Sequence, residues 1–196
     1  MRILIWSLVL FLSGLSGPFA TAFADEKAPF GLTWGSSVEK LKASGVNLQQ
    51  RISDKSGVRF AATNLPRALS DLGEAILSFG NNNELHKIEA IGEDVTNDPA
   101  GTRLKARYDA LARALTSKYG KGVTRHEIPE PWTRPNDFLT GIYRGSSHYY
   151  TDFTGENVTV RLNIRASRRG ISNYVLIFQH KKTPRGNERL PEKDVL

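Results

Sequence analysis

The densest group of side chains capable of chemistry is SSHYYTDF, residues 146–153. If this segment is a strand, His148, Tyr150 and Asp152 lie on one face, because side chains alternate between the two faces of a strand. Tyrosine rings combine stacking area with a polar tip, so this row suits the binding of a sugar or a peptide. The same row is also typical of an ordinary half-exposed sheet face. Both interpretations are open at the level of sequence.

A second candidate is Trp132, which lies among three prolines in the segment HEIPEPWTRPNDFLTG, residues 126–141. We expect this segment to be a long irregular loop. Loops longer than about 12 residues are uncommon in compact domains and are often binding elements or lids. The alternative is that Trp132 closes the edge of the core and the prolines stiffen the loop.

A third candidate is the pair Arg103 and Arg107, which are one turn apart on a strongly predicted helix. These two residues are the ones to test first for binding of a polyanion. A wider basic set would add Arg165, Arg168 and Arg169, and it predicts binding that weakens steeply with salt. A solvated helix face is the ordinary alternative.

Catalytic and metal-binding patterns are not found. The four histidines stand in separate segments without zinc-ligand spacing, and the chain has no cysteine. GSSVE is not a nucleophile elbow, and no glycine-rich phosphate loop precedes a helix. We therefore predict a non-enzymatic protein with no metal and no cofactor. The alternative is an envelope hydrolase of glycan or ester substrates that uses His148, Asp152 and a carboxylate of the long loop.

The N-terminus has the pattern of an export signal. Met1 and Arg2 precede the apolar run at residues 3–12, and Ala22-Phe23-Ala24 precedes a charged segment. This order predicts a signal peptide at residues 1–24, cut after Ala24, and hence a periplasmic protein. The apolar run is much shorter than the roughly 20 residues of a membrane-spanning helix, so we expect no membrane span.

Charge restricts the expected partners. The chain has a net charge of +7, which cleavage would lower to +6 because Arg2 is the only charged residue removed. Moderate basicity favours another envelope protein or an anionic envelope polymer. Nucleic acid is not expected, because an exported protein seldom meets it and no basic run with interleaved aromatic residues occurs.

Hydrophobic periodicity predicts the elements that would position these residues. Ser36 and Glu39 have the spacing of a capping box, which begins a helix at residues 37–44. Asp98 and Gly120 bound a second helix, whose apolar stripe consists of Leu104, Tyr108, Leu111 and Leu115. Alternating patterns predict strands at residues 58–63, 74–79, 85–91, 146–153, 158–166 and 171–180.

The resulting order is α-βββ-α-βββ. It predicts an α+β fold in which an antiparallel sheet of about six strands carries two helices on one face. We expect a single domain at residues 25–182, a flexible tail at residues 183–196, and two similar halves that suggest a duplication.

Three motifs carry a resemblance: GLTWGSSVEKL, LSFGNNNELHKI and ALTSKYGKG. With them the chain resembles a loose group of uncharacterised exported bacterial proteins that begin with a GLxWG-S helix start. The arrangement is also similar to the helix-on-sheet modules of outer-membrane assembly lipoproteins and of the β-lactamase-inhibitor-protein fold. The resemblance implies a fold and assigns no functional residue. The lack of a cysteine departs from the lipoprotein pattern.

These observations favour a non-enzymatic periplasmic binding or interaction protein, inhibitor-like or immunity-like in kind. It would hold its partner with the open sheet face at His148, Tyr150 and Asp152 and with the loop that carries Trp132. The runner-up functions are the envelope hydrolase and the polyanion-binding envelope protein.

Overall fold

The computed structural model describes residues 26–54, 57–167 and 170–181. The predicted signal peptide and C-terminal tail lie outside the described residues, as do Arg168 and Arg169.

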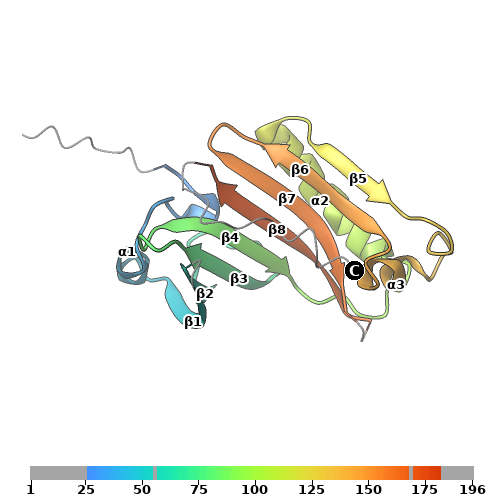
Figure 1. Cartoon of the computed structure of the whole chain (residues 1–196), viewed down its shortest axis with the longest axis horizontal. Coiled ribbons are helices and arrows are strands. Elements are labelled where there is room, and N and C mark those ends of the chain that lie inside the picture. The colour runs from blue at the N-terminus through green and yellow to red at the C-terminus, as the bar shows by residue number, and fades with distance from the viewer. Residues whose placement is uncertain (1–25, 55–56, 168–169, 182–196) are drawn as a thin grey trace, which may run out of the picture.

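The described chain contains three α-helices, a 3-10 turn and eight strands (Figure 1). The helical elements are η1 (Pro29–Gly31), α1 (Val38–Ala43), α2 (Thr102–Tyr119) and α3 (Phe138–Tyr143). The strands are β1 (Asn47–Asp54), β2 (Gly57–Thr63), β3 (Leu72–Phe79), β4 (Leu85–Gly92), β5 (Val123–Glu127), β6 (His148–Thr154), β7 (Val158–Ala166) and β8 (Ser172–His180).

All eight strands form one antiparallel sheet in the order β1-β2-β3-β4-β8-β7-β6-β5. Each half of the chain contributes a run of four neighbouring strands, and the two runs meet where β4 pairs with β8. The prediction of an α+β fold with an antiparallel sheet is confirmed. The predicted numbers were too small, since the sheet has eight strands rather than six and three helices pack on it rather than two.

The two strands that periodicity missed are the edges of the sheet. In β1 every residue except the half-buried Leu48 is exposed, and in β5 every residue is exposed. A strand that buries neither face has no alternation of apolar and polar residues, so its pattern is indistinguishable from a loop.

The predicted loop at residues 126–141 is also partly ordered into elements. Its first two residues belong to β5, and α3 begins at Phe138, inside the loop. Phe138 and Leu139 are buried, but a six-residue helix is too short to display a 3.6-residue period.

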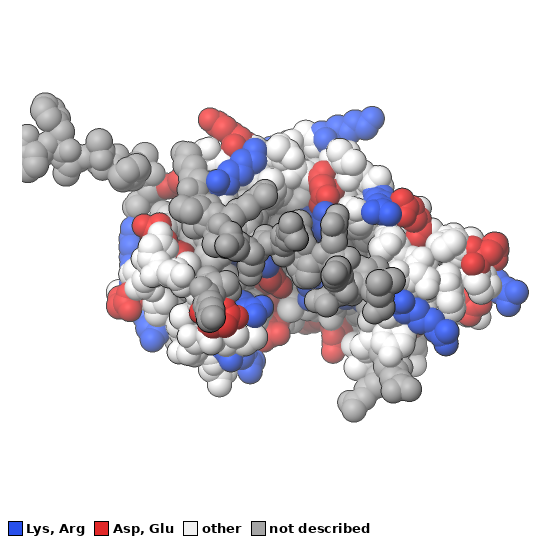
Figure 2. Space-filling model, in the orientation of Figure 1, with Lys and Arg blue, Asp and Glu red and all other residues white. Residues whose placement is uncertain are grey.

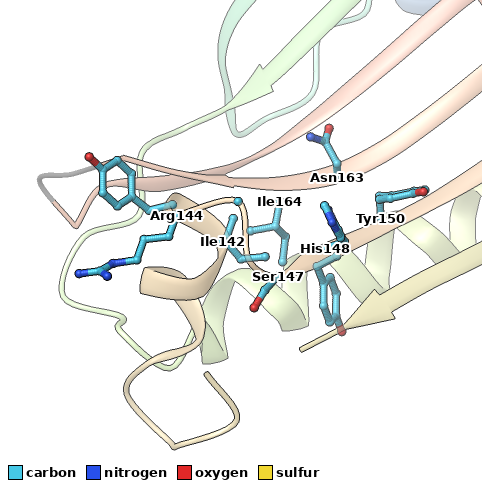
Figure 3. Close-up of a pocket in the computed structure, with 10 residues that line it drawn as sticks. Ile142, Arg144, Ser147, His148, Tyr150, Asn163 and Ile164 are labelled. Carbon is cyan, nitrogen blue, oxygen red and sulfur yellow. The ribbon is translucent and has the colours of Figure 1, made fainter. Parts of the chain in front are cut away.

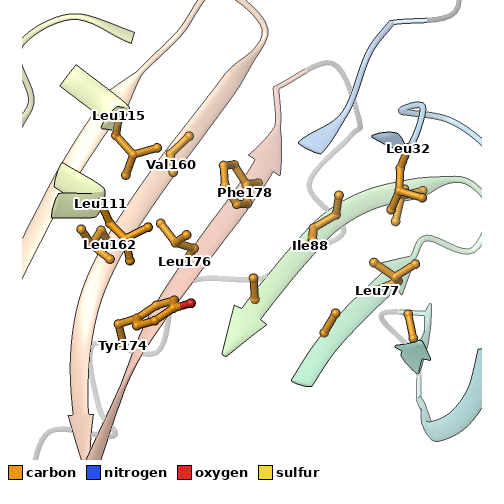
Figure 4. Close-up of a cluster of buried hydrophobic side chains, with 14 of the residues drawn as sticks. Leu32, Leu77, Ile88, Leu111, Leu115, Val160, Leu162, Tyr174, Leu176 and Phe178 are labelled. Atoms are coloured by element: carbon orange, nitrogen blue, oxygen red, sulfur yellow. The ribbon is translucent and has the colours of Figure 1, made fainter. Parts of the chain in front are cut away.

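The core lies on one face of the sheet. The stripe of α2 is buried as predicted, and it packs over Val160 and Leu162 of β7 and Leu176 of β8 (Figure 4). At the β4 side the N-terminal segment covers the same face, with Leu32 over Ile88 and Leu77. Ile88, Phe178 and Val160 stand opposite one another across three strands, which places both coverings on one face.

Both main helices begin with side-chain caps, and in each the cap differs from the predicted geometry. Ser37, rather than Ser36, accepts the Lys40 amide of α1. Helix α2 begins at Thr102 after Gly101, three residues beyond Asp98. The Asp98 carboxylate nevertheless accepts the first backbone amides, 2.8 Å from Thr102 N and 3.0 Å from Arg103 N. Asp98 therefore caps α2 as predicted, although the helix begins later than predicted, and the predicted cap of α1 was one residue too early.

None of the described helices is long and apolar enough to cross a membrane.

Candidate functional site

The sheet forks between β6 and β7. These strands pair from Thr154 and Thr159 only as far as Tyr150 and Asn163. Beyond that rung β6 continues against β5, where His148 pairs with Glu127, and β7 continues against β8. We call this opening the β6–β7 fork, bounded by His148 and Tyr149 on one side and by residues 164–166 on the other.

A pocket of about 380 Å³ lies at the β6–β7 fork, between the end of α3 and the two strands (Figure 3). Its lining consists of Ile142, Tyr143, Arg144, Gly145, Ser147, His148, Tyr149, Tyr150, Asn163 and Ile164. Two of the predicted site residues, His148 and Tyr150, are therefore part of one pocket. The other lining residues come from α3, from the turn after it and from β7.

Two polar atoms of this lining are buried without a partner among the described residues: Ser147 Oγ and Asn163 Oδ1. Ser147 as a whole is 3% exposed. An unsatisfied buried polar group costs about 1–3 kcal/mol, and native proteins contain few of them. The two atoms lie on opposite sides of the sheet: Ser147 Oγ packs against Gly141 of α3, and Asn163 alternates with the buried Leu162 and Ile164 (Figure 3).

Trp132 supports the pocket from behind. A Cβ atom on Gly141 of α3 would lie 2.5 Å from Ser147 Oγ and 2.8 Å from Trp132 Cβ, so only glycine allows both side chains to approach the helix. The Arg144 guanidinium lies over the Trp132 ring, 5.4 Å from its centroid. Trp132 is half-buried and holds α3 and Arg144, but it does not line the pocket.

Tyr149 forms part of the wall and is held by an aromatic cluster. The His126 ring stacks on it with centroids 3.6 Å apart, and Tyr108 meets it edge to face. The Tyr108 hydroxyl forms a 2.7 Å hydrogen bond with Thr151 Oγ1. His126 is exposed as a residue, but stacking on Tyr149 desolvates its ring in part and lowers its pKa. Burial raises the pKa of Tyr108 and Tyr149, so all three rings are neutral near pH 7.

Asp152, the third residue of the predicted row, does not line the pocket and forms an ion pair with Arg161. Arg161 donates two hydrogen bonds of 2.7 Å to its carboxylate, and the guanidinium also lies 4.4 Å from the Tyr150 ring centroid. The pairing with Asp152 raises the pKa of Arg161. His148 and Asp152 are four residues apart on one strand, which is about 13 Å. They share a face but cannot form a hydrogen-bonded dyad.

Arg103 and Arg107 do not form a free anion-binding pair. Arg107 donates two hydrogen bonds to Asp71, which lies between β2 and β3, and Arg103 donates to the Thr96 carbonyl. An anion would have to displace these partners. On β7, Arg165 lies 3.9 Å from Glu89.

Several charged groups of the described residues form mixed pairs. On the face in Figure 2, basic and acidic side chains of the described residues are interspersed, and no large patch of one sign appears. Arg161 with Asp152, Arg125 with Glu127, and Lys87 with Glu89 are three such pairs. Within the described ranges, no group of three His, Asp or Glu side chains is placed to hold a metal ion.

Sequence reasoning missed Ser147, Asn163 and Arg144. In the sequence, Asn163 is one polar residue in the alternation of residues 158–166, and Ser147 stands near the start of a predicted strand. Nothing in either pattern signals that the side chain is buried without a partner. The segment FLTGIYRGSSH, with a glycine inside an apolar run, carried the only available signal of a close approach.

Comparison with known proteins gives no match, since no protein-family model fits the chain and no curated protein or solved structure is similar to it. The resemblance to exported bacterial proteins and to helix-on-sheet modules therefore stays a prediction from the motifs.

Proposed function

We propose that this protein is a non-enzymatic periplasmic binding protein whose ligand occupies the pocket at the β6–β7 fork. The observation that carries the proposal is the pocket itself, a cavity of about 380 Å³ whose walls include the polar side chains of His148, Tyr150 and Asn163. These side chains offer hydrogen-bond donors and acceptors to a bound ligand.

The rest of the lining supports binding rather than covalent chemistry. Ligand pockets are mostly apolar and aromatic, with a few polar groups that fix orientation, and their volumes range from about 300 to 1,000 Å³. The pocket here is within this size range and includes the apolar Ile142 and Ile164 and the aromatic Tyr149 and Tyr150, although its surface is slightly more polar than apolar.

The hydrolase alternative has weaker support. Its proposed acid–base pair, His148 and Asp152, is separated by about 13 Å along β6, and Asp152 is bound to Arg161. A general acid or base must lie within hydrogen-bond reach of the group it serves. The polyanion alternative meets a similar obstacle, because Arg107 is bound to Asp71.

The test is an affinity pull-down from periplasmic extract with residues 25–196 as bait, at low and at high salt. The wild type should retain a species that survives high salt, and Asn163→Ala and Trp132→Ala should lose most of it. Thr159→Ala is the matched control, because Thr159 is an exposed residue of the same strand outside the pocket.

Equal capture by the wild type, Asn163→Ala and Trp132→Ala would contradict the proposal. Capture of acidic polymers alone, lost at high salt, would favour the polyanion function instead.

A further inference from the structure

We propose that β5 pairs with β5 of a second copy of this chain, antiparallel and about a two-fold axis at His126. The two sheets would then form one continuous sheet across the dimer. The inference does not depend on the pocket at the β6–β7 fork, because no residue of β5 lines that pocket. It combines the openness of the β5 edge, the side chains along it and the register that these side chains favour.

Strand β5 is an open edge of the sheet. It is the last strand in the sheet order, and it lies at the margin of the molecule in Figure 1. All five of its residues are exposed, and Val123, at 76%, is the most exposed large hydrophobic side chain of the described residues. An open edge without proline is a template for pairing with another strand.

The backbone of β5 has unused hydrogen-bonding groups on this edge. In the turn after β6, Gly155 N donates to Val158 O, so the odd-numbered residues of β6 bond to β7 and the even-numbered ones to β5. The register of β5 with β6 therefore leaves the amide and carbonyl groups of Thr124 and His126 on the free side. Among the described residues, neither receives a backbone hydrogen bond from beyond the sheet.

The opposite edge of the sheet is irregular. The register of β1 shifts between Gln50 and Ile52, which leaves Arg51 in a bulge. Bulges twist an edge strand away from further pairing. The pairing of β5 with β6 has no such shift. Of the two edges of the described sheet, β5 is therefore the one suited to receive another strand.

The side chains of β5 match one another in a single antiparallel register. With His126 opposite its own copy, Arg125 lies opposite Glu127 of the second copy, and the two-fold axis repeats this pair. Facing opposite charges stabilise antiparallel strands. Because Arg125 and Glu127 also pair within each copy, 2.7 Å apart, the four charges form one network. At each end of the contact, the exposed Val123 lies opposite Pro129, which is apolar.

The neighbouring registers are less favourable. With Arg125 on the axis, two guanidinium groups would lie directly opposite each other, and like charges there are destabilising. With Thr124 on the axis, Glu127 would face Lys121, but Arg125 would face Val123 and its charge would have no match in the second copy. With His126 on the axis no like charges meet, because its lowered pKa keeps the ring neutral near pH 7.

The experiment measures the mass of residues 25–196 by sedimentation equilibrium at concentrations from about 1 μM to about 1 mM. The wild type should form a dimer. Arg125→Glu and Glu127→Arg should each weaken dimerisation about tenfold or more, since each converts both pairs between the copies into like charges. Lys121→Glu is the matched control. It reverses a charge just outside the contact, so it should dimerise as the wild type does.

A mixture of the two variants separates the effect of charge from a failure to fold. Arg125→Glu and Glu127→Arg have complementary edges, so together they should form a heterodimer although each alone is mainly monomeric. A wild type that is monomeric at about 1 mM, a dimer that survives both charge reversals, a mixture without heterodimer, or dissociation by Lys121→Glu would overturn the inference. A monomeric wild type that captures a different protein from periplasmic extract, and loses it on Arg125→Glu, would assign the edge to that protein instead.

Discussion

Asp71 accepts two hydrogen bonds from the Arg107 guanidinium, each 2.5 Å long, and a third of 3.0 Å from the Tyr174 hydroxyl. The carboxylate thereby joins three elements, because Asp71 precedes β3, Arg107 belongs to α2 and Tyr174 belongs to β8. This network gives Arg107 a structural role within the helix face that the sequence presented as a basic surface.

Replacing Arg107 with alanine should lower the free energy of unfolding by about 1 kcal/mol. The pair is bidentate, but the side chains of Arg107 and Asp71 are 36% and 30% exposed, so solvent screens it. Chemical denaturation measures the difference. Arg113→Ala is the control, since Arg113 is an exposed residue of the same helix, and it should change stability by less than about 0.5 kcal/mol. Equal effects of the two substitutions would contradict the role of the pair.

The contribution of the ionised Asp71 carboxylate to the free energy of unfolding should disappear at low pH. Burial alone would raise the pKa of this carboxyl, but hydrogen bonds from Arg107 and Tyr174 outweigh burial and lower it below its ordinary value of 3.8. A lowered pKa in the folded state stabilises the protein above the unfolded pKa, and this stabilisation is lost as the pH falls through the folded value.

The matching measurement compares the wild type with Asp71→Asn by urea denaturation. The stability difference should be full near pH 6 and should shrink below about pH 3.8, where protonated Asp71 resembles asparagine. A difference that is constant across this range would show that Asp71 acts through its shape alone.

Gly141→Ala should destabilise the protein by about 1–3 kcal/mol, although alanine is the better helix former. The added Cβ would lie 2.5 Å from Ser147 Oγ and 2.8 Å from Trp132 Cβ, so one of these side chains must move. Thr140→Ala, at the neighbouring exposed position of α3, should cost little. If thermal unfolding places Gly141→Ala at or above the wild type, the close approach of Trp132 and Ser147 to α3 is wrong.

The imidazole of His126 should titrate below pH 6.5 in an NMR experiment. Burial lowers its pKa; the Asp109 carboxylate opposes this shift, while the Lys105 ammonium adds to it. Lys105→Met should therefore raise the midpoint, and Lys118→Met, farther along α2, should leave it unchanged. Because the folded state favours the neutral ring, its contribution to stability is full above pH 6.5 and falls as the pH drops below that value. A midpoint at or above 6.5 would contradict the partial desolvation of the stacked ring.

Periodic segments were predicted well because burial imposes a period on them. The stripe from Leu104 to Leu115 identified α2, and the alternation of residues 158–166 matched β7 from end to end. Residues with no burial pattern were missed, as in β5, where Val123 is 76% exposed. The same reason explains the short helix α3, whose six residues cannot repeat a period.

The structure brings some of the predicted site residues together in one pocket and separates others, and their role in binding stays a prediction. His148 and Tyr150 were selected because strand geometry places them on one face, and both line the pocket. Asp152, on the same face, bonds to Arg161, which the register of β6 and β7 places opposite it. Trp132 lies behind the pocket rather than in it, because Gly141 lets it pack against α3.

The sequence by itself determined the α+β class, the antiparallel strands and the buried face of α2, because these depend on local periodicity and on caps within a few residues. Only the tertiary structure decided where β6 and β7 part, which carboxylate holds Arg107, and that Ser147 Oγ and Asn163 Oδ1 are buried without a partner among the described residues. Those features depend on register and on contacts between residues far apart in the chain. Arg107 and its partner Asp71 illustrate this. They are 36 residues apart in the chain, and the sequence around either residue gives no indication of the pairing.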